Sequence, residues 1–201
     1  TFGNQFETVT SLWKKFKSVE ITVSLDGPPE ISEYIRHGSS IEQIKTNIKR
    51  LESWAKDESF NLQLMGGCAF STNNTPHFLE TVQFITSLGL RFIINYVESP
   101  SYQSPQVLPK KTKAEITKRF EVFQDNIEQE LENSFSNHPI WSDKSLKSQQ
   151  TKRISQQLES LMNFMNGADH SDLFQYHKQF NRVFNREFGG KIGYTNSDAQ
   201  Q

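Results

Sequence analysis

Hydrophobic residues along the first half of the chain alternate between two spacings. Apolar residues recur every three or four positions in 5–17, 40–55 and 75–88, which predicts amphipathic helices. Stretches rich in apolar, β-branched and aromatic residues favour strands, and these lie at 20–26, 61–70 and 91–97. Alternation of helices and strands predicts parallel strands joined by helical crossovers. The fold class is therefore α/β, and this order fits part of an open sheet or part of a βα barrel.

The second half of the chain has only the helical spacing. Three prolines between residues 100 and 109 mark an extended connection, and a clean apolar stripe then predicts one long helix at about 112–133. We expect 134–150 to be loop-like with Trp141 as an anchor, and two more helices to follow. The predicted organisation is a βα region at 1–109, a helical region at 110–188 and a disordered tail at 189–201.

Polar side chains end the first predicted strand. Ser24 and Asp26 lie two residues apart, which predicts that both point to the same side. Gly27 and two prolines then end the strand, and ligands bind at the carboxyl ends of strands in parallel sheets. A hydroxyl beside a carboxylate suits a ribose diol, a hydroxylated substrate or a metal-bound water. The alternative is a strand end capped by local hydrogen bonds. We expect the residues after it, including Glu30, to form a polar loop.

Composition limits the classes of partner. The 201 residues carry a formal net charge of −1, which argues against nucleic acid or an anionic membrane as an obligate partner. No apolar run approaches the ~20 residues of a membrane span, and the first residues have no signal-peptide pattern. The single cysteine, Cys68, rules out an internal disulfide and fits a reducing compartment, so we expect a cytoplasmic protein.

Several linked motifs carry a resemblance to a known family. The first is Val-Ser-Leu-Asp-Gly-Pro at 23–28, the second is Tyr-Ile-Arg-His-Gly-Ser at 34–39, and a helix with Asn47, Ile48 and Leu51 follows. Together they resemble the middle of the radical S-adenosylmethionine enzymes, in the branch with SPASM or twitch extensions. The resemblance covers about residues 10–110. It implies a partial parallel βα barrel with three βα units, followed by a helical appendage.

The resemblance also implies a cofactor site. Ser24 matches the polar residue that hydrogen-bonds S-adenosylmethionine at the end of the fourth barrel strand, and Asp26 is a candidate helper. Arg36 matches an arginine that either orients the cofactor carboxylate or ties the loop to nearby acidic residues. Asn74 falls near the end of the next strand, where it binds the cofactor or simply forms a turn. Asn95 and Tyr96 are candidates to face the same pocket.

The chain departs from this family in its cysteines. The family holds a four-iron–four-sulfur cluster with three cysteines in a CxxxCxxC loop, and one cysteine cannot form that loop. Because the first residue is Thr rather than Met, we expect the cluster-bearing N-terminal half of the barrel to lie upstream; a degenerate relative is the alternative. The expected substrate is a small molecule or peptide attacked by a radical, and this chain alone is expected to be inactive.

Other side-chain groups allow different functions. The residues Asp169, His170, Asp172 and His177 are of metal-ligating types, although helix capping explains them as well. A basic run at 110–119 lacks the interleaved aromatic residues of a nucleic-acid site. Two alternatives to a radical enzyme remain. One is a cluster-free βα-barrel module that binds a ligand at the strand ends, and the other is a non-catalytic interaction domain that uses the predicted helix at 112–133.

Overall fold

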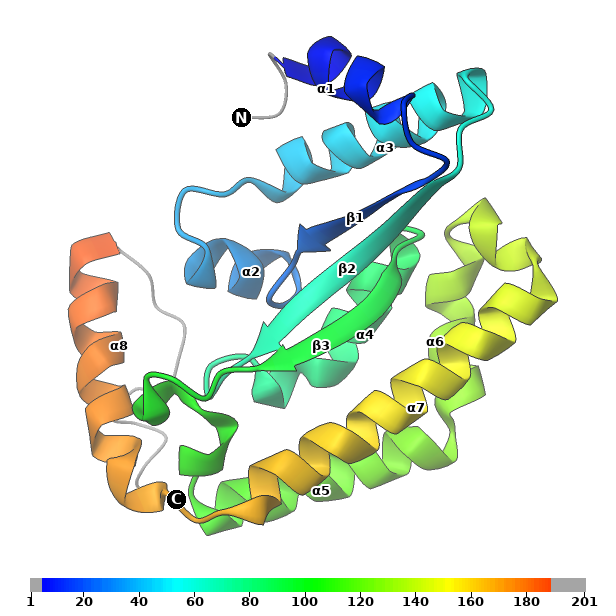
Figure 1. Ribbon diagram of the computed structural model, residues 1–201. Coiled ribbons are helices and arrows are strands. Elements are labelled where there is room, and N and C mark those ends of the chain that lie inside the picture. Colours follow the sequence, from blue (N-terminus) through cyan, green and yellow to red (C-terminus); the bar gives the residue numbers. More distant parts are fainter. Residues whose placement is uncertain (1–4, 189–201) are drawn as a thin grey trace.

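The computed structural model describes residues 5–188 as a three-stranded parallel sheet with helices packed on one face and around its edges (Figure 1). The strands are β1 (Val19–Ser24), β2 (Leu62–Phe70) and β3 (Arg91–Tyr96). The helices are α1 (Phe6–Trp13), α2 (Pro29–Ile35), α3 (Ile41–Asp57), α4 (Phe78–Ser87), α5 (Lys110–Asp125), α6 (Ile127–Ser136), α7 (Lys144–Gly167) and α8 (Phe174–Phe188). Among the described helices, none has both the length and the apolarity needed to cross a bilayer.

The predicted α/β class and the parallel sheet are confirmed. The strand order is β1-β2-β3, with Val19 opposite Leu62 and Met65 opposite Arg91 in parallel register. Helix α3 connects β1 to β2 and α4 connects β2 to β3, as parallel neighbours require. All three strand ends therefore meet at one edge of the sheet. The structure does not establish the barrel type.

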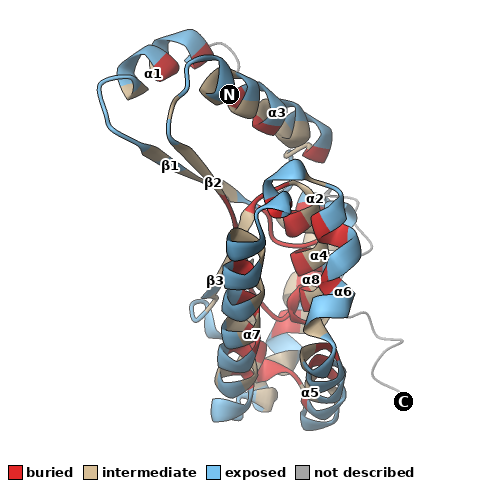
Figure 2. Ribbon diagram, turned by 90° about the vertical axis from the view of Figure 1, so that its right-hand side faces the viewer, coloured by how far each residue is buried: buried red, intermediate tan, exposed pale blue. Residues whose placement is uncertain are grey.

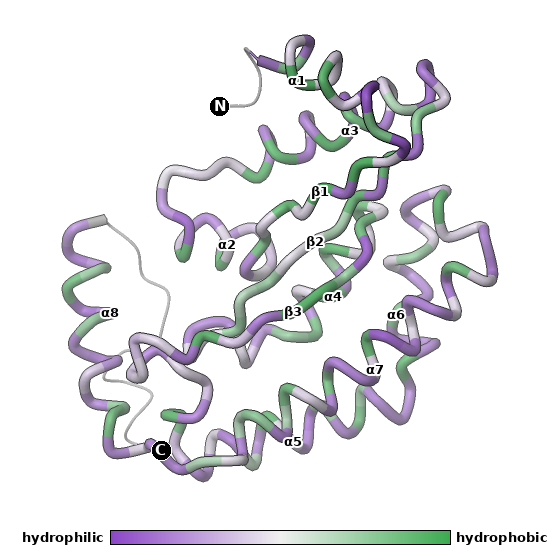
Figure 3. Tube along the Cα trace, in the orientation of Figure 1, coloured by the Kyte–Doolittle hydropathy of each residue, from purple (hydrophilic) through white to green (hydrophobic). Residues whose placement is uncertain are grey.

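Helix α4 packs closely against one face of the sheet. A Cβ atom on Gly66 would lie 2.3 Å from Cγ2 of Ile85, so only glycine permits this approach of β2 to α4. Phe78 of α4 contacts the rings of Phe70 and Phe92, with centroids 5.2 and 5.6 Å away, and the Phe120 ring of α5 at 5.3 Å. Apolar segments gather along β2, β3 and α4 (Figure 3), and buried residues gather around α4 and the inner sides of α5 and α7 (Figure 2).

The opposite face of the sheet carries no described helix (Figures 1 and 2). Gly67 belongs to this face, because a Cβ there would lie 2.7 Å from Cγ2 of Thr22 and 3.8 Å from Ile93. Thr22, Ser24 and Asn95 are exposed. Parallel sheets are normally covered on both faces. We call this surface the open face. Helix α7 packs beside β3, where Phe164 stacks on Tyr96 at 4.5 Å.

Two predicted loops contain helices instead. The polar loop expected after β1 forms α2, because Pro28 and Pro29 occupy its first positions, where a missing N–H costs nothing. The loop expected at 134–150 contains the end of α6, a short 3₁₀ turn (Pro139–Ser142) and the first turns of α7. The carboxylate of Asp143 accepts hydrogen bonds from the first N–H groups of α7, which begins there.

The prediction of a single long helix at 112–133 is wrong. It is divided at Asn126, whose φ of −122° and ψ of 19° end α5 before α6 begins. The apolar stripe continues through the break because both helices bury their inner faces, so spacing alone did not indicate the bend. Trp141 is an anchor as predicted: it is buried, and Nε1 donates a 2.7 Å hydrogen bond to the Thr86 carbonyl. The predicted disordered tail at 189–201 lies outside the described residues.

Candidate functional site at the strand ends

The chain turns sharply from the end of β1 into α2. Leu25 and Asp26 are buried directly after the strand, and Gly27 follows. A Cβ on Gly27 would lie 2.6 Å from Cγ2 of Ile31, so α2 approaches the turn more closely than a larger residue permits. The short helix therefore sits directly on the strand end and carries Tyr34 and Arg36 to the carboxyl edge of the sheet.

The carboxylate of Asp26 connects three segments. Its Oδ1 accepts a 2.8 Å hydrogen bond from the backbone N–H of Ala69 at the end of β2. Its Oδ2 lies 2.7 Å from Nε of Arg36, and its own backbone N–H donates to Oγ of Ser32 at 3.2 Å. The side chain of Asp26 is 6% exposed and that of Arg36 is 39% exposed. Arg36 therefore reaches the surface, and it compensates the charge of the buried Asp26.

Arg36 retains hydrogen-bonding capacity. Its Nε pairs with Asp26, and within residues 5–188 its two terminal nitrogens make no hydrogen bond. A guanidinium with two free nitrogens binds a carboxylate or phosphate in a bidentate manner. The sequence left two roles open for Arg36. The ion pair with an acidic residue is present, and it leaves the terminal nitrogens free to bind a carboxylate.

Asn74 joins the ends of β1 and β2. It is fully buried, and its Nδ2 donates to the carbonyls of Asp26 and Ala69 at 2.8 and 3.0 Å. Its Oδ1 accepts from the backbone N–H of Ser71 at 2.6 Å. Both the donor and the acceptor of the Asn74 amide are therefore used in hydrogen bonds within the protein. Asn74 holds the carboxyl edge together, in agreement with the interpretation of this residue as part of a turn.

Ser24 and Asp26 do not share one environment. Ser24 is exposed at the end of β1, on the open face, whereas Asp26 is buried. Pairing with β2 ends at Ser24, after which the chain turns. Asn95 is also exposed on the open face, and Tyr96 packs on α7, where its hydroxyl donates to Ser160 at 2.6 Å. Of the predicted residues, only Asp26, Arg36 and Asn74 are joined through hydrogen bonds and ion pairs around one strand end.

A pocket of about 160 Å³ lies beside this cluster. Its walls come from the ends of all three strands, from α2, from the segment after β3 and from α8. Its lining residues are Asp26, Tyr34, Ile35, Ala69, Ser71, Asn73, Val97, Gln103, Phe180 and Phe184. We call it the α8 pocket. Sequence reasoning did not assign Asn73, Gln103, Phe180 or Phe184 to a site, because the chain gave no indication of where its last helix would pack.

Helix α8 is attached to the strand ends by an amide pair. Asn73 and Asn181 exchange two hydrogen bonds of 3.3 and 3.0 Å. Asn181 also contacts Nε2 of His177 at 3.0 Å. His177 is fully buried, and this burial lowers its pKa to about 4. Aromatic contacts complete the attachment, with Phe184 lying 5.1 Å from Tyr34 and Phe180 lying 5.8 Å from Tyr102.

Tyr34 lines the α8 pocket, and its hydroxyl oxygen is buried and unsatisfied. The residue is 8% exposed, and within the described part of the chain its hydroxyl has no hydrogen-bond partner. Burial raises its pKa to about 12, so the group remains protonated and can donate. Buried polar groups usually have a partner, which makes this hydroxyl the most unusual group at the site.

The predicted metal-ligating types do not come together. Asp169 pairs with Lys110 at 3.1 Å and caps the following turn through the N–H of Ser171, whereas His177 is buried beside Asn181. The described residues hold no group of three His, Cys, Asp or Glu side chains arranged to bind a metal. Cys68 is 1% exposed, and burial raises the pKa of its thiol, which makes it a poor nucleophile.

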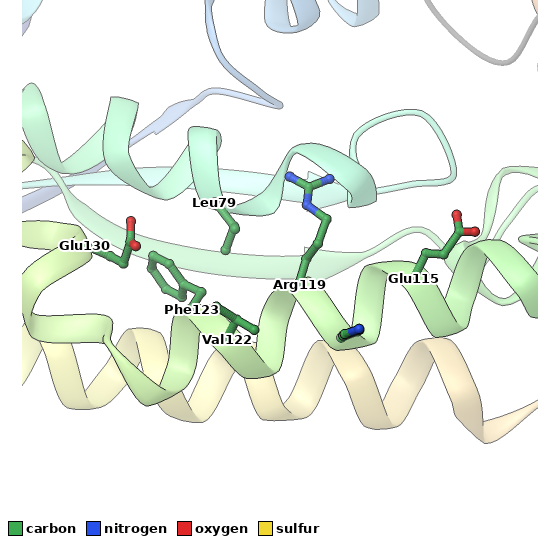
Figure 4. A pocket seen from close by; sticks show the side chains of 7 residues that line it. Leu79, Glu115, Arg119, Val122, Phe123 and Glu130 are labelled. Atoms are coloured by element: carbon green, nitrogen blue, oxygen red, sulfur yellow. The ribbon is translucent and has the colours of Figure 1, made fainter.

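A second hollow lies on the helical side of the molecule (Figure 4). This groove of about 460 Å³ runs between α4 and α5, where Leu79, Val122 and Phe123 provide apolar surface. Arg119 at its side pairs with Glu80 at 3.3 Å. The groove shares no lining residue with the α8 pocket.

Comparison of the chain with known family models, with curated proteins and with solved structures gives no match in any of the three.

Proposed function

We propose that this chain supplies the cofactor-binding edge of an enzyme of the radical S-adenosylmethionine type. The observation that carries the proposal is the Asp26–Arg36 pair at the carboxyl end of β1, within the motif that resembles this family. Arg36 is half-exposed there and has two uncommitted nitrogens. The edge where three parallel strands end is also the usual ligand site of such sheets.

The residues at this edge fit the polar groups of S-adenosylmethionine. The fork of Arg36 would hold the cofactor carboxylate, and Asp26 would orient that fork. The exposed hydroxyl of Ser24 would hydrogen-bond the ribose or the amino-acid group from the open face. Asn74 would act through the two strand ends that it joins, since its own polar groups are engaged.

The residues of this chain do not fit an iron–sulfur cluster. A cluster needs several exposed thiolates, and Cys68 is the single cysteine and is buried against the helical layer. These residues by themselves therefore supply no radical step. In this proposal, the N-terminal half of the barrel brings the cluster as a partner of this chain, and a small-molecule or peptide substrate binds over the open face.

Calorimetric titration with S-adenosylmethionine tests the proposal. We expect the wild-type chain to bind, and Arg36→Lys to weaken binding about tenfold, because lysine keeps the charge near Asp26 but loses the bidentate fork. Ser24→Ala should weaken binding by a comparable or smaller amount, the ~0.5–1.5 kcal/mol of one hydrogen bond.

Arg119→Lys is the matched control, since Arg119 is exposed beside the remote groove. It should leave the affinity unchanged. Absence of heat with wild-type protein, or equal affinity for wild type and Arg36→Lys, would contradict the proposed site.

The α8 pocket favours a second candidate function. A cluster-free βα module that binds a ligand at its strand ends needs only such a pocket, and the walls of this one include residues at the ends of all three strands. This candidate predicts ligand binding by a chain that shows no affinity for S-adenosylmethionine.

A further inference from the structure

We propose that residues 12–17, at the end of α1, bind the surface of an anionic lipid bilayer. In this proposal Leu12 and Phe16 enter the membrane interface, and Lys15 and Lys17 contact the anionic headgroups. We call this segment the α1 turn. It joins α1 to the start of β1, at the opposite edge of the sheet from the carboxyl ends of the strands, so the proposal does not depend on the proposed cofactor (Figure 1).

The first argument is the exposure of two large apolar side chains on a held backbone. Leu12 is 50% exposed and Phe16 is 63% exposed. The N–H of Lys15 donates to the Leu12 carbonyl at 3.1 Å, and the N–H of Phe16 donates to the Trp13 carbonyl at 2.8 Å. The Trp13 ring packs edge-on against Trp54 of α3, with centroids 5.9 Å apart. The α1 turn is therefore attached to α3 while it presents a leucine and a phenylalanine to solvent.

The second argument is the local charge. The α1 turn contains three lysines and no acidic residue. Lys14 pairs with Glu58 at 2.7 Å. Lys15 and Lys17 are exposed, and in the described part of the chain neither forms an ion pair. Two cationic groups beside exposed apolar side chains complement an anionic membrane surface. The net charge of −1 for the whole chain makes this attraction local, so the membrane is a partner without being an obligate one.

The third argument is the shape of the site, which favours a bilayer over a macromolecular partner. Neither hollow described above includes a residue of the α1 turn, whereas a peptide helix binds in a groove. Nucleic-acid bases stack on aromatic rings, and the aliphatic side chain of Leu12 offers no ring. Exposed leucine and phenylalanine beside lysines are typical of segments that lie in the membrane interface.

The test measures co-sedimentation of the full chain with two kinds of vesicle, phosphatidylcholine alone and phosphatidylcholine with about 30% phosphatidylserine. We expect binding to the anionic vesicles to be tighter by about tenfold or more, because only these vesicles attract the two lysines. Raising the NaCl concentration from about 0.1 to 1 M shortens the Debye length from about 10 to 3 Å and should release most of the bound protein.

Substitutions in the α1 turn separate the two contributions. Phe16→Gln should weaken binding to the anionic vesicles about tenfold, because it removes an inserted ring. Phe16→Trp should bind like wild type, since tryptophan suits the membrane interface. Joint Lys15→Gln and Lys17→Gln substitution should weaken binding by about tenfold or more.

Matched controls lie on the helical side of the molecule. Val122→Gln removes another exposed apolar side chain, 57% exposed on α5. Joint Lys118→Gln and Lys152→Gln substitution removes two other exposed lysines, from α5 and α7. Both controls should leave vesicle binding within about twofold of wild type, because neither site enters the interface or contacts the headgroups.

Three results would overturn the proposal. One is the absence of binding to the anionic vesicles, or equally tight binding to the neutral ones. Another is equal vesicle binding by wild type and Phe16→Gln. The third is Phe16-dependent self-association, or Phe16-dependent binding of a single-stranded oligonucleotide, in a chain that binds no vesicle. That result would assign the α1 turn to a second copy or to nucleic acid.

Discussion

At the scale of single residues, the strand ends contain two kinds of polar group. Asp26 and Asn74 are buried and engaged within the protein, and they hold the carboxyl edge in shape. For the terminal nitrogens of Arg36 and the buried hydroxyl of Tyr34, no hydrogen bond is seen within residues 5–188. The first kind determines stability, and in the second kind the part-exposed guanidinium of Arg36 is available for a ligand. Substitutions therefore should affect stability and binding separately.

Asn74→Ala tests the structural role of the first kind. The change leaves the Ser71 N–H and the carbonyls of Asp26 and Ala69 without their partner in a buried region. We expect the free energy of unfolding to fall by about 3 kcal/mol, measured by urea denaturation. Asn95→Ala, at an exposed position on β3, is the control and should change it by less than about 0.5 kcal/mol. Equal values for the two variants would show that the Asn74 network is dispensable.

At the scale of elements, close packing of helices on one side defines the sheet. The contact of β2 with α4 depends on Gly66, and the aromatic group of Phe70, Phe78 and Phe92 fills the space beside it. The predicted helices and strands of this region are present within a few residues of their expected ends. These elements could be predicted because each of them buries one face, and burial of one face spaces apolar residues at regular intervals along the sequence.

Gly66→Ala should destabilise the protein by about 1–3 kcal/mol, because the new methyl group would overlap Cγ2 of Ile85 at 2.3 Å. The matched control is Gly167→Ala at the end of α7, where a new Cβ meets no atom within 4 Å. Alanine has the higher helix propensity, so this control should stabilise by roughly 0.5–1 kcal/mol. Thermal melts of both variants check the pair, and a neutral Gly66→Ala would mean that α4 moves away from β2 easily.

At the scale of the whole molecule, α8 closes the carboxyl edge and buries a titratable group. Burial lowers the pKa of His177 to about 4 from the ordinary value of 6.5. Between these two values the unfolded chain binds a proton that folded His177 does not. The contribution of neutral His177 is therefore complete above pH 6.5 and is lost as the pH falls toward 4.

The loss amounts to about 3 kcal/mol over this range. We expect urea denaturation of wild-type protein to show this decline between pH 6.5 and 4, with His177→Gln showing a flatter pH dependence whatever its absolute stability. His170→Gln removes an exposed histidine and should keep the wild-type slope. The same slope in wild type and His177→Gln would assign the acid sensitivity to other groups.

The candidate site was only partly readable from the chain. Asp26 stood out because it ends a strand just before a glycine–proline turn, and Arg36 because it matches an arginine of the family that the motifs resemble. The structure joins the two through an ion pair. Tyr34 falls in the segment that the sequence predicts as a loop, because a helix as short as α2 leaves little periodic pattern. Phe180 and Phe184 lie on the last predicted helix, and the helical spacing gives no indication of the surface on which that helix packs.

The sequence by itself determined the α/β class, the parallel order and most strand and helix positions, because these depend on local propensity and on the period of burial. Only the tertiary structure decided that α5 and α6 are separate, that α8 covers the strand ends, and that one sheet face lacks a described covering helix. These features depend on contacts between residues far apart in the chain, such as Asn73 with Asn181. The sequence pattern indicates that a residue is buried, but only the fold determines which residue it packs against.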